Sequence, residues 1–98
     1  MILIEQEPHF WELYQQDQQF FLSLAVDMSS VVSCWDLVLT QAEISAYRSQ
    51  HRQAIEELVK QLVQSAYRGD FSNIENRLAC SEQQHLMQQC FKQWRTQT

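Results

Sequence analysis

Apolar and polar residues alternate along the first forty positions of the chain, whereas later apolar residues recur every three or four positions. Alternation is typical of a strand with one buried face, and the longer period is typical of an amphipathic helix. The sequence therefore predicts a sheet-forming first part and a helical second part. We expect a single domain over residues 1–98, because a chain of this length supports one compact core.

The clearest strand pattern covers residues 20–39. With Ser29 and Ser30 as the turn of a hairpin, one face pairs Met28 with Val31, Leu24 with Trp35, Leu22 with Leu37 and Phe20 with Leu39. The opposite face pairs Asp27 with Val32, Ala25 with Cys34, Ser23 with Asp36 and Phe21 with Val38. A slip of one residue would bury Asp36 and expose Trp35, so the pattern specifies the register. Because two-residue turns favour Gly or Asn, a three- or four-residue loop stays open.

A second alternating stretch runs from Phe10 to Gln15. A turn at Asp17 and Gln18 would pair Leu13 with Leu22 and Trp11 with Leu24, which extends the apolar face of the first hairpin. The sequence thus predicts a three-stranded antiparallel meander. The apolar stretch from Met1 to Ile4 could add an edge strand, and Pro8 would then end its pairing or set a bend.

A capping box at Thr40 and Glu43 predicts that a helix begins near Gln41. A stripe of apolar residues then runs from Ile44 to Ala66 and includes His51. These residues indicate one unbroken helix of about 27 residues, roughly 40 Å long, with one end overhanging the sheet.

The end of this helix and the elements after it are indicated by cap residues. Gly69 stands where a C-terminal cap needs a positive φ. Further capping boxes at Ser72 with Glu75 and Ser81 with Gln84 predict helices near Asn73 to Ala79 and from about Glu82 to Arg95, or one bent helix. The predicted fold class is α+β: a three-stranded meander packed on one long helix, with one or two C-terminal helices.

Charge is unevenly distributed along the chain, whose formal net charge is -5. All 7 Lys and Arg residues lie between Arg48 and Arg95, whereas acidic residues begin at Glu5 and run through the predicted strands. Phosphate binding needs concentrated basic residues, so nucleic acid is not expected as a partner of the sheet. A cationic protein partner is expected instead.

The compartment is suggested by the cysteines and the N-terminus. Three cysteines without metal-like spacing indicate reduced thiols, and an acidic start is unlike a signal peptide. We therefore expect a cytoplasmic protein. Its apolar runs are far shorter than the roughly 20 residues that span a bilayer, so membrane insertion is not expected.

The side chains most suggestive of a metal site are Cys80, His85 and Cys90. Spacings of five residues place successive side chains on different helix faces, unlike the paired ligands of helical zinc sites. We expect buried apolar cysteines, no metal and no cofactor.

A nucleophile and base could be formed by Cys34 with His51 or His9. Cys34 lies in the middle of a predicted strand, however, and activated thiolates sit at helix N-termini or exposed loops. With no Gly-rich loop to hold phosphate either, the chain is not expected to be an enzyme.

The strongest candidate surface is the sheet face turned away from the long helix. A row of Glu12, Ser23 and Asp36 would cross it between aromatic side chains, and aromatic anchors surrounded by charges are typical of protein-recognition surfaces. The candidate partner-binding residues are Phe10, Glu12, Tyr14, Phe21, Asp27 and Asp36. Two alternatives stay open: the C-terminal helix covers this face with Phe91 and Trp94, or a second copy of the chain covers it.

Part of the chain resembles a known group of proteins. The strand FxLxLxV, the junction WxLxLTxxEI, Tyr47 and the helical IxxLVKQL are similar to small bacterial proteins that are found beside polymorphic toxin genes and thought to be immunity proteins. The resemblance implies a protein that binds and blocks a toxin, and it carries over no catalytic residue. The first hypothesis is thus an immunity or antitoxin-like inhibitor of a cationic toxin, such as a nuclease. The alternative is a small acidic homodimeric chaperone or assembly adaptor.

Overall fold

A computed structural model describes residues 1–28 and 31–97. The strands β1 (Ile2–Glu7), β2 (Trp11–Gln16), β3 (Gln19–Met28) and β4 (Val31–Val38) form one antiparallel sheet in that order, and the helices are α1 (Gln41–Gln50), α2 (Arg52–Tyr67), α3 (Ser72–Glu75) and α4 (Ser81–Gln97). The predicted α+β class is confirmed. The sheet has one strand more than the predicted meander, since the N-terminal stretch pairs with β2.

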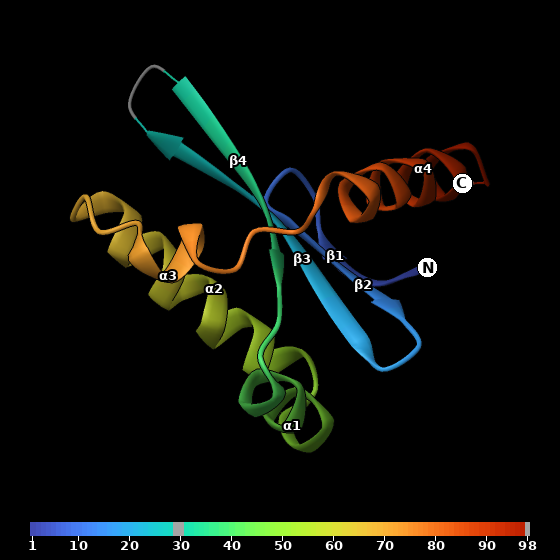
Figure 1. Cartoon of the computed structure of the whole chain (residues 1–98), viewed down its shortest axis with the longest axis horizontal. Coiled ribbons are helices and arrows are strands. Elements are labelled where there is room, and N and C mark those ends of the chain that lie inside the picture. Colours follow the sequence, from blue (N-terminus) through green and yellow to red (C-terminus); the bar gives the residue numbers. More distant parts are fainter. Residues whose placement is uncertain (29–30, 98) are drawn as a thin grey trace.

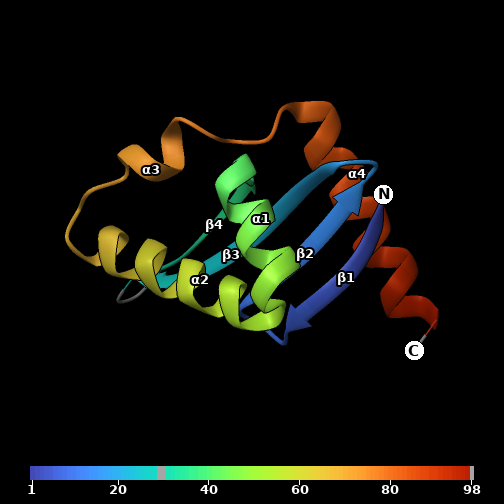
Figure 2. The ribbon, with the colours of Figure 1, turned by 90° about the horizontal axis from the view of Figure 1, so that it is seen from below.

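The elements form three layers, with α1 and α2 on one side of the sheet and α4 on the other (Figures 1 and 2). Each sheet face therefore has its own apolar core. The larger core includes the buried residues Trp11, Leu13, Phe20, Leu22, Leu24, Val26, Leu37, Leu39, Ile44, Ile55, Val59, Leu62 and Ile74. The smaller core, under α4, is built on the buried residues Tyr14, Phe21, Ala79 and Met87.

The predicted register of the sheet is confirmed. Leu24 faces Trp35 across β3 and β4, and it faces Trp11 across β2 and β3. Trp35 is half-buried and packs on Phe71, with ring centroids 5.8 Å apart. Ser29 and Ser30 lie outside the described residues, so the shape of their turn stays a prediction.

The N-terminal strand is longer than predicted. It continues past Ile4 to Glu7, which faces Trp11, and its register shifts between Leu3 and Glu5. Leu3 packs against the smaller core and Ile4 against the larger one. Both faces of this strand thus contribute to packing, which explains why it stays paired up to Pro8.

The prediction of one unbroken helix is wrong, because the helix is interrupted at His51. This residue has φ 57 and ψ -134, and its N–H ends α1 by bonding to the carbonyl of Tyr47 at 2.6 Å. His51 is exposed rather than part of the buried stripe. The break folds α1 back against α2, so that Ile44 and Ile55 both reach the core and no long end overhangs the sheet.

The caps of this helical pair match their predictions. Thr40 and Glu43 form the capping box, with Thr40 N–H donating to Glu43 Oε1 at 2.9 Å. Gly69 has φ 78, and the Gly69 and Asp70 amides bond back to the carbonyls of Ala66 and Ser65 at 3.0 and 2.9 Å. These two bonds form a Schellman cap, which ends α2.

The C-terminal helices begin differently from the predictions. Ser72 does not cap α3; its N–H and hydroxyl both donate to the Asp70 carboxylate. The α4 helix already includes Ser81, and the Gln83 side chain accepts from the N–H of Cys80. The capping side chain therefore lies one position before the predicted Gln84. Among the described residues, no helix is long and apolar enough to cross a membrane.

The segment between α3 and α4 closes part of the outer edge of β4. Val38 N–H donates to the carbonyl of Arg77 at 2.9 Å, and Ala79 N–H donates to the carbonyl of Asp36 at 2.8 Å. Arg77 also forms a largely buried ion pair with Glu43 at the start of α1. The link to α4 is thereby fixed to both the sheet and α1.

Candidate functional site

The outer sheet face is not open as predicted, because α4 covers part of it. Tyr14 and Phe21 are only 2% and 0% exposed, so the expectation that these aromatics are available to a partner is wrong. Phe91 packs over them and lies beside Trp94, as the alternative prediction of a covering helix required. Large aromatics on this face need a cover of their own, since the larger core occupies the other side of the sheet.

The predicted polar row is present beside α4. Glu12 faces Ser23, and Ser23 faces Asp36, in a hollow of about 260 Å³ that Lys92 and Arg95 also line. Burial, and then the neighbouring Asp36 carboxylate, raise the pKa of Glu12. Basic side chains from α4 thus share the hollow with these acids, and the charge separation seen along the sequence is reduced in space.

The other two predicted residues, Phe10 and Asp27, lie at a different place. They line adjoining parts of a groove between the turn at residues 8–10 and helix α2, with volumes of about 540 and 370 Å³. Phe10, Val63 and Tyr67 line both parts. We call this the aromatic groove and define it by Phe10, Trp11, Val59, Val63 and Tyr67.

The aromatic groove exists because β2 is shorter than β3. Just before β2 begins, the Ala25 N–H donates to the carbonyl of Phe10 at 2.8 Å, which ties the turn to the sheet. Beyond that point, the Tyr67 hydroxyl donates to the carbonyl of Asp27 at 3.1 Å. Phe10 and Tyr67 remain 38% and 62% exposed. The turn at residues 8–10 and helix α2 thus form two walls of the groove, and each presents an aromatic ring to solvent. Hydrogen bonds to the backbone of β3 anchor both walls.

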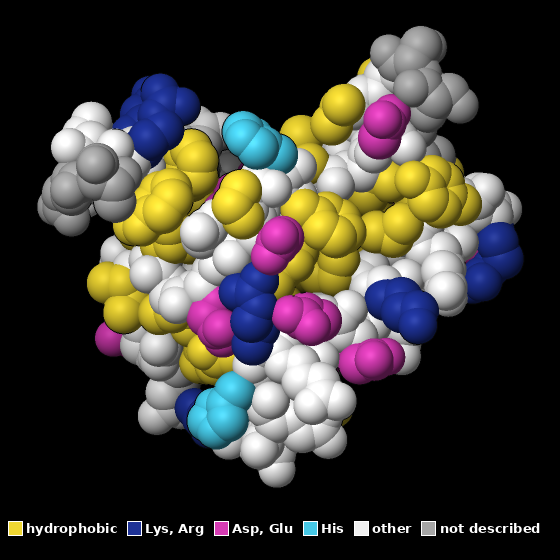
Figure 3. All heavy atoms as spheres, turned by 180° about the vertical axis from the view of Figure 1, so that it is seen from behind, with side chains coloured by type: hydrophobic (Ala, Val, Ile, Leu, Met, Phe, Trp, Pro, Cys, Tyr) yellow, Lys and Arg dark blue, Asp and Glu magenta, His cyan; other side chains and the backbone are white. Residues whose placement is uncertain are grey.

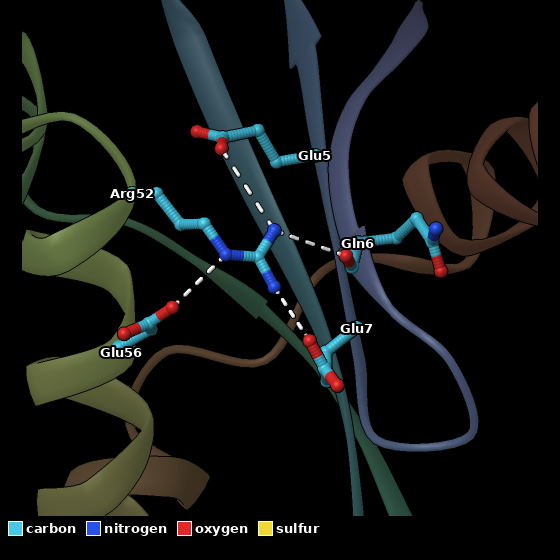
Figure 4. A network of polar contacts seen from close by, with 5 residues as sticks. All are labelled: Glu5, Gln6, Glu7, Arg52 and Glu56. Atoms are coloured by element: carbon cyan, nitrogen blue, oxygen red, sulfur yellow. Dashed lines mark hydrogen bonds and ion pairs between the residues drawn. The ribbon is translucent and has the colours of Figure 1, made fainter.

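One end of the aromatic groove is formed by an ion cluster around Arg52 (Figure 4). The guanidinium donates to Glu7 at 2.6 Å, to Glu56 at 2.9 Å and to the carbonyl of Gln6 at 3.1 Å, and it lies 4.0 Å from Glu5. The helix break at residue 51 makes Arg52 the first residue of α2, which brings it to β1. The cluster therefore links the helix layer to the edge of the sheet.

The titratable groups around this cluster include the phenol of Tyr47. Burial, and then contact with Glu5, raise the pKa of Tyr47 to about 12, so its phenol is neutral at pH 7. Arg52 is held by several acceptors at once.

The rim of the groove is more acidic than basic. Glu7, Asp27 and Glu56 are exposed, while Arg52 and Lys60 supply the basic side chains. Figure 3 shows hydrophobic side chains gathered on the back of the molecule, interrupted by charged side chains of both signs. The groove is consequently suited to a ligand that is apolar in part and basic in part.

The cysteines differ from the prediction of buried thiols. Cys34 and Cys80 are exposed, and only Cys90 is partly buried, with its thiol 3.5 Å from the carbonyl of Met1. His85 is exposed. Within residues 1–28 and 31–97, no three His, Cys, Asp or Glu side chains gather as metal ligands.

Some groove residues were missed at the level of sequence. Val63 belongs to the predicted buried stripe of the helix, and Tyr67 lies just beyond the last residue of that stripe, Ala66. A tyrosine at a helix end, two residues before the capping glycine, is a sequence signal for exposure. For Arg52 the sequence predicts the i,i+4 pair with Glu56, which the structure confirms, but its contacts with β1 depend on the helix break.

Comparisons with known proteins do not identify a family. No family model, curated protein or solved structure was found to match the chain.

Proposed function

We propose that the protein binds and blocks a basic partner protein, in the manner of an immunity protein or antitoxin, and that the aromatic groove is its docking site. The observation that carries this proposal is the pair of exposed aromatics, Phe10 and Tyr67, on two walls of an apolar groove with an acidic rim. Binding energy at protein interfaces is concentrated in aromatic and arginine anchors that fill such depressions.

Charge complementarity selects the partner. The chain has a net charge of -5, and the exposed carboxylates of Glu7, Asp27 and Glu56 surround the groove. A basic protein would be attracted to this face over a distance of about 8 to 10 Å at physiological salt, which increases the association rate. A basic toxin domain fits this chemistry, and its inhibition follows if the contacted segment belongs to its active cleft.

The arrangement of the cluster favours binding over catalysis. The Arg52 guanidinium donates to Glu7, Glu56 and the carbonyl of Gln6, and these hydrogen bonds fix the positions of the side chains at this end of the groove. A pre-formed, internally paired surface loses little conformational freedom on binding. This supports an inhibitor or adaptor rather than an enzyme.

The test is capture of a partner from the native host, followed by titration with purified variants. Phe10→Ala/Tyr67→Ala should weaken binding roughly a hundredfold, because two anchors are removed. The matched control is Ile2→Ala/Leu78→Ala, which removes two hydrophobic side chains that are 58% and 47% exposed and lie outside the groove. The control should bind like the wild type.

The result has to meet three conditions. The captured protein must be basic, its binding must weaken as salt is added, and its own activity must fall when the complex forms. A partner that binds the Phe10→Ala/Tyr67→Ala variant as tightly as the wild type would contradict the assignment of the groove.

A second candidate function is a homodimeric chaperone or assembly adaptor. It is favoured by a different feature, the open part of the β4 edge, where Val31 and Val32 are each 61% exposed. The two candidates are separated by the activity of the captured partner, which an inhibitor lowers and an adaptor leaves intact.

A further inference from the structure

The outer edge of β4 is closed along only part of its length. The carbonyl of Asp36 and the N–H of Val38 point outward and bond to the segment of residues 77–79, whereas the N–H of Leu39 points inward to Phe20. Backbone groups alternate in direction along a strand, so those of Val32 and Cys34 also point outward. Within residues 1–28 and 31–97, no backbone group bonds to them.

The other open edges of the sheet are protected. On β1 the register shifts between Leu3 and Glu5, Glu5 and Glu7 add charge, and Arg52 occupies the carbonyl of Gln6. These are the devices that normally prevent strands from pairing edge to edge. On β3 the Tyr67 hydroxyl occupies the carbonyl of Asp27.

The free part of β4 has no comparable protection. Its sequence from Val31 to Trp35 contains no charged residue, proline or glycine. Val31 and Val32 are each 61% exposed, and Cys34 is exposed as well. An apolar, uncharged strand edge of this kind favours pairing with another strand.

We propose that this edge pairs with the same edge of a second copy of the chain, antiparallel about a two-fold axis at Ser33, which joins the two sheets into one. In this register the outward N–H and carbonyl of Val32 face those of Cys34 of the second copy, so each group gains a partner. Centring the pair on Cys34 would instead place Val32 against Asp36, whose carbonyl already accepts from Ala79.

The free edge is short, and it therefore suits a second copy of the chain better than a longer extended segment of another protein. The segment of residues 77–79 occupies the edge from Asp36 onward, so an incoming strand has room only alongside residues 31–35. A second copy offers a free stretch of the same length by symmetry. Side chains that face each other are then apolar or small: Val31 opposite Trp35, and Val32 opposite Cys34.

The register is tested by disulfide formation in a Cys80→Ser/Cys90→Ser background. A protein with only Cys34 is mixed with one carrying Val32→Cys/Cys34→Ser, and an oxidant is added. The facing Cα atoms would be about 5.5 Å apart, which suits a disulfide, whereas two Cys34 residues would be about 8 Å apart. We expect a cross-linked dimer from the mixture and little from Cys34 alone. Efficient cross-linking of Cys34 alone would overturn the Ser33-centred register.

The interface is tested independently with two variants that each introduce two charged residues. Val32→Lys/Cys34→Lys brings lysines together across the axis, whereas Val32→Glu/Cys34→Lys places each glutamate opposite a lysine of the second copy. Because both positions are exposed, the folded monomer should tolerate both changes. By sedimentation equilibrium, the first variant should have a dimer dissociation constant at least roughly tenfold higher than the second.

Salt provides a further readout. Two copies with a net charge of -5 each repel one another, so added salt should strengthen the dimer. A wild-type protein that stays monomeric up to millimolar concentration, or a dimer that responds equally to both charge variants, would overturn the proposal.

Discussion

The guanidinium of Arg52 lies over the ring of Trp11, 4.8 Å from its centroid, and covers a tryptophan that is only 2% exposed. One side chain thus closes the larger core and forms the end of the aromatic groove. It does so from the first residue of α2, while its acceptors Glu7 and Gln6 lie on β1. Stability and the shape of the candidate site are therefore coupled at this residue.

The first prediction concerns this contact. Arg52→Ala removes a networked set of hydrogen bonds and a cation–π contact, and it should lower the free energy of unfolding by about 1 to 2 kcal/mol. Arg52→Lys keeps the charge without the planar fork and should lose about half as much. Urea denaturation of the two variants measures both values. Equal stability of Arg52→Ala and the wild type would show that the cluster contributes nothing.

The second prediction separates the aromatics of the fold from those of the groove. Phe21 is 0% exposed under α4, so Phe21→Ala should cost about 3 to 5 kcal/mol. Phe10 is 38% exposed, and Phe10→Ala should cost less than about 1 kcal/mol. Thermal and urea unfolding of the two variants provide the comparison. Similar losses at both positions would mean that α4 does not protect Phe21.

The sheet could be predicted from sequence because its evidence is local. Alternation fixes which side chains share a face, and burying Asp36 in place of Trp35 is costly enough to exclude a slipped register. The capping box at Thr40 and the positive φ at Gly69 were likewise accessible, since each depends on a few neighbouring residues.

The helix break and the covered face could not be predicted from the same signals. His51 interrupts the helix without a nearby glycine or proline, and the break lets α1 pack on α2 and Arg52 reach β1. The position of α4 depends on the bridge between Leu37 and Leu78. The signal that was available was the run of large apolar residues at Phe20, Phe21 and Leu22, which is typical of a strand buried on both faces.

The third prediction concerns pH. Because the folded-state pKa of Glu12 is raised above its ordinary value of 4.5, the native state binds a proton there more readily than the unfolded state. Glu12 therefore lowers stability above its folded pKa, and this cost disappears below about pH 4. Glu12→Gln should be more stable than the wild type at pH 7 and no more stable near pH 4.

Thermal unfolding at both pH values tests this sign. Asp36→Asn removes the second cause of the raised pKa of Glu12. It should therefore change the pH dependence of stability in the same direction as Glu12→Gln, but by a smaller amount. A Glu12→Gln variant that is destabilised at pH 7 would show that the carboxylate is stabilised in its charged form, for example by Lys92 or Arg95 in the same hollow.

The fourth prediction concerns the thiols. Cys34 and Cys80 are exposed, so both should react with a thiol reagent within seconds to minutes, whereas the partly buried Cys90 should react more slowly. Single Cys→Ser variants show which cysteine gives rise to each kinetic phase of the reaction. A fast phase that survives in Cys34→Ser/Cys80→Ser would contradict the packing of α4. If the proposed dimer forms, the rate at Cys34 should also fall as protein concentration rises.

The central claim is that the aromatic groove docks a basic protein, and amide chemical-shift mapping of the isotope-labelled chain tests it most directly. On addition of the captured basic partner, the account predicts the largest changes at Phe10, Asp27, Val63 and Tyr67, with smaller changes at the hollow of Glu12 and Asp36. Changes confined to that hollow or to residues 33–35, with the signals of the groove unmoved, would contradict it.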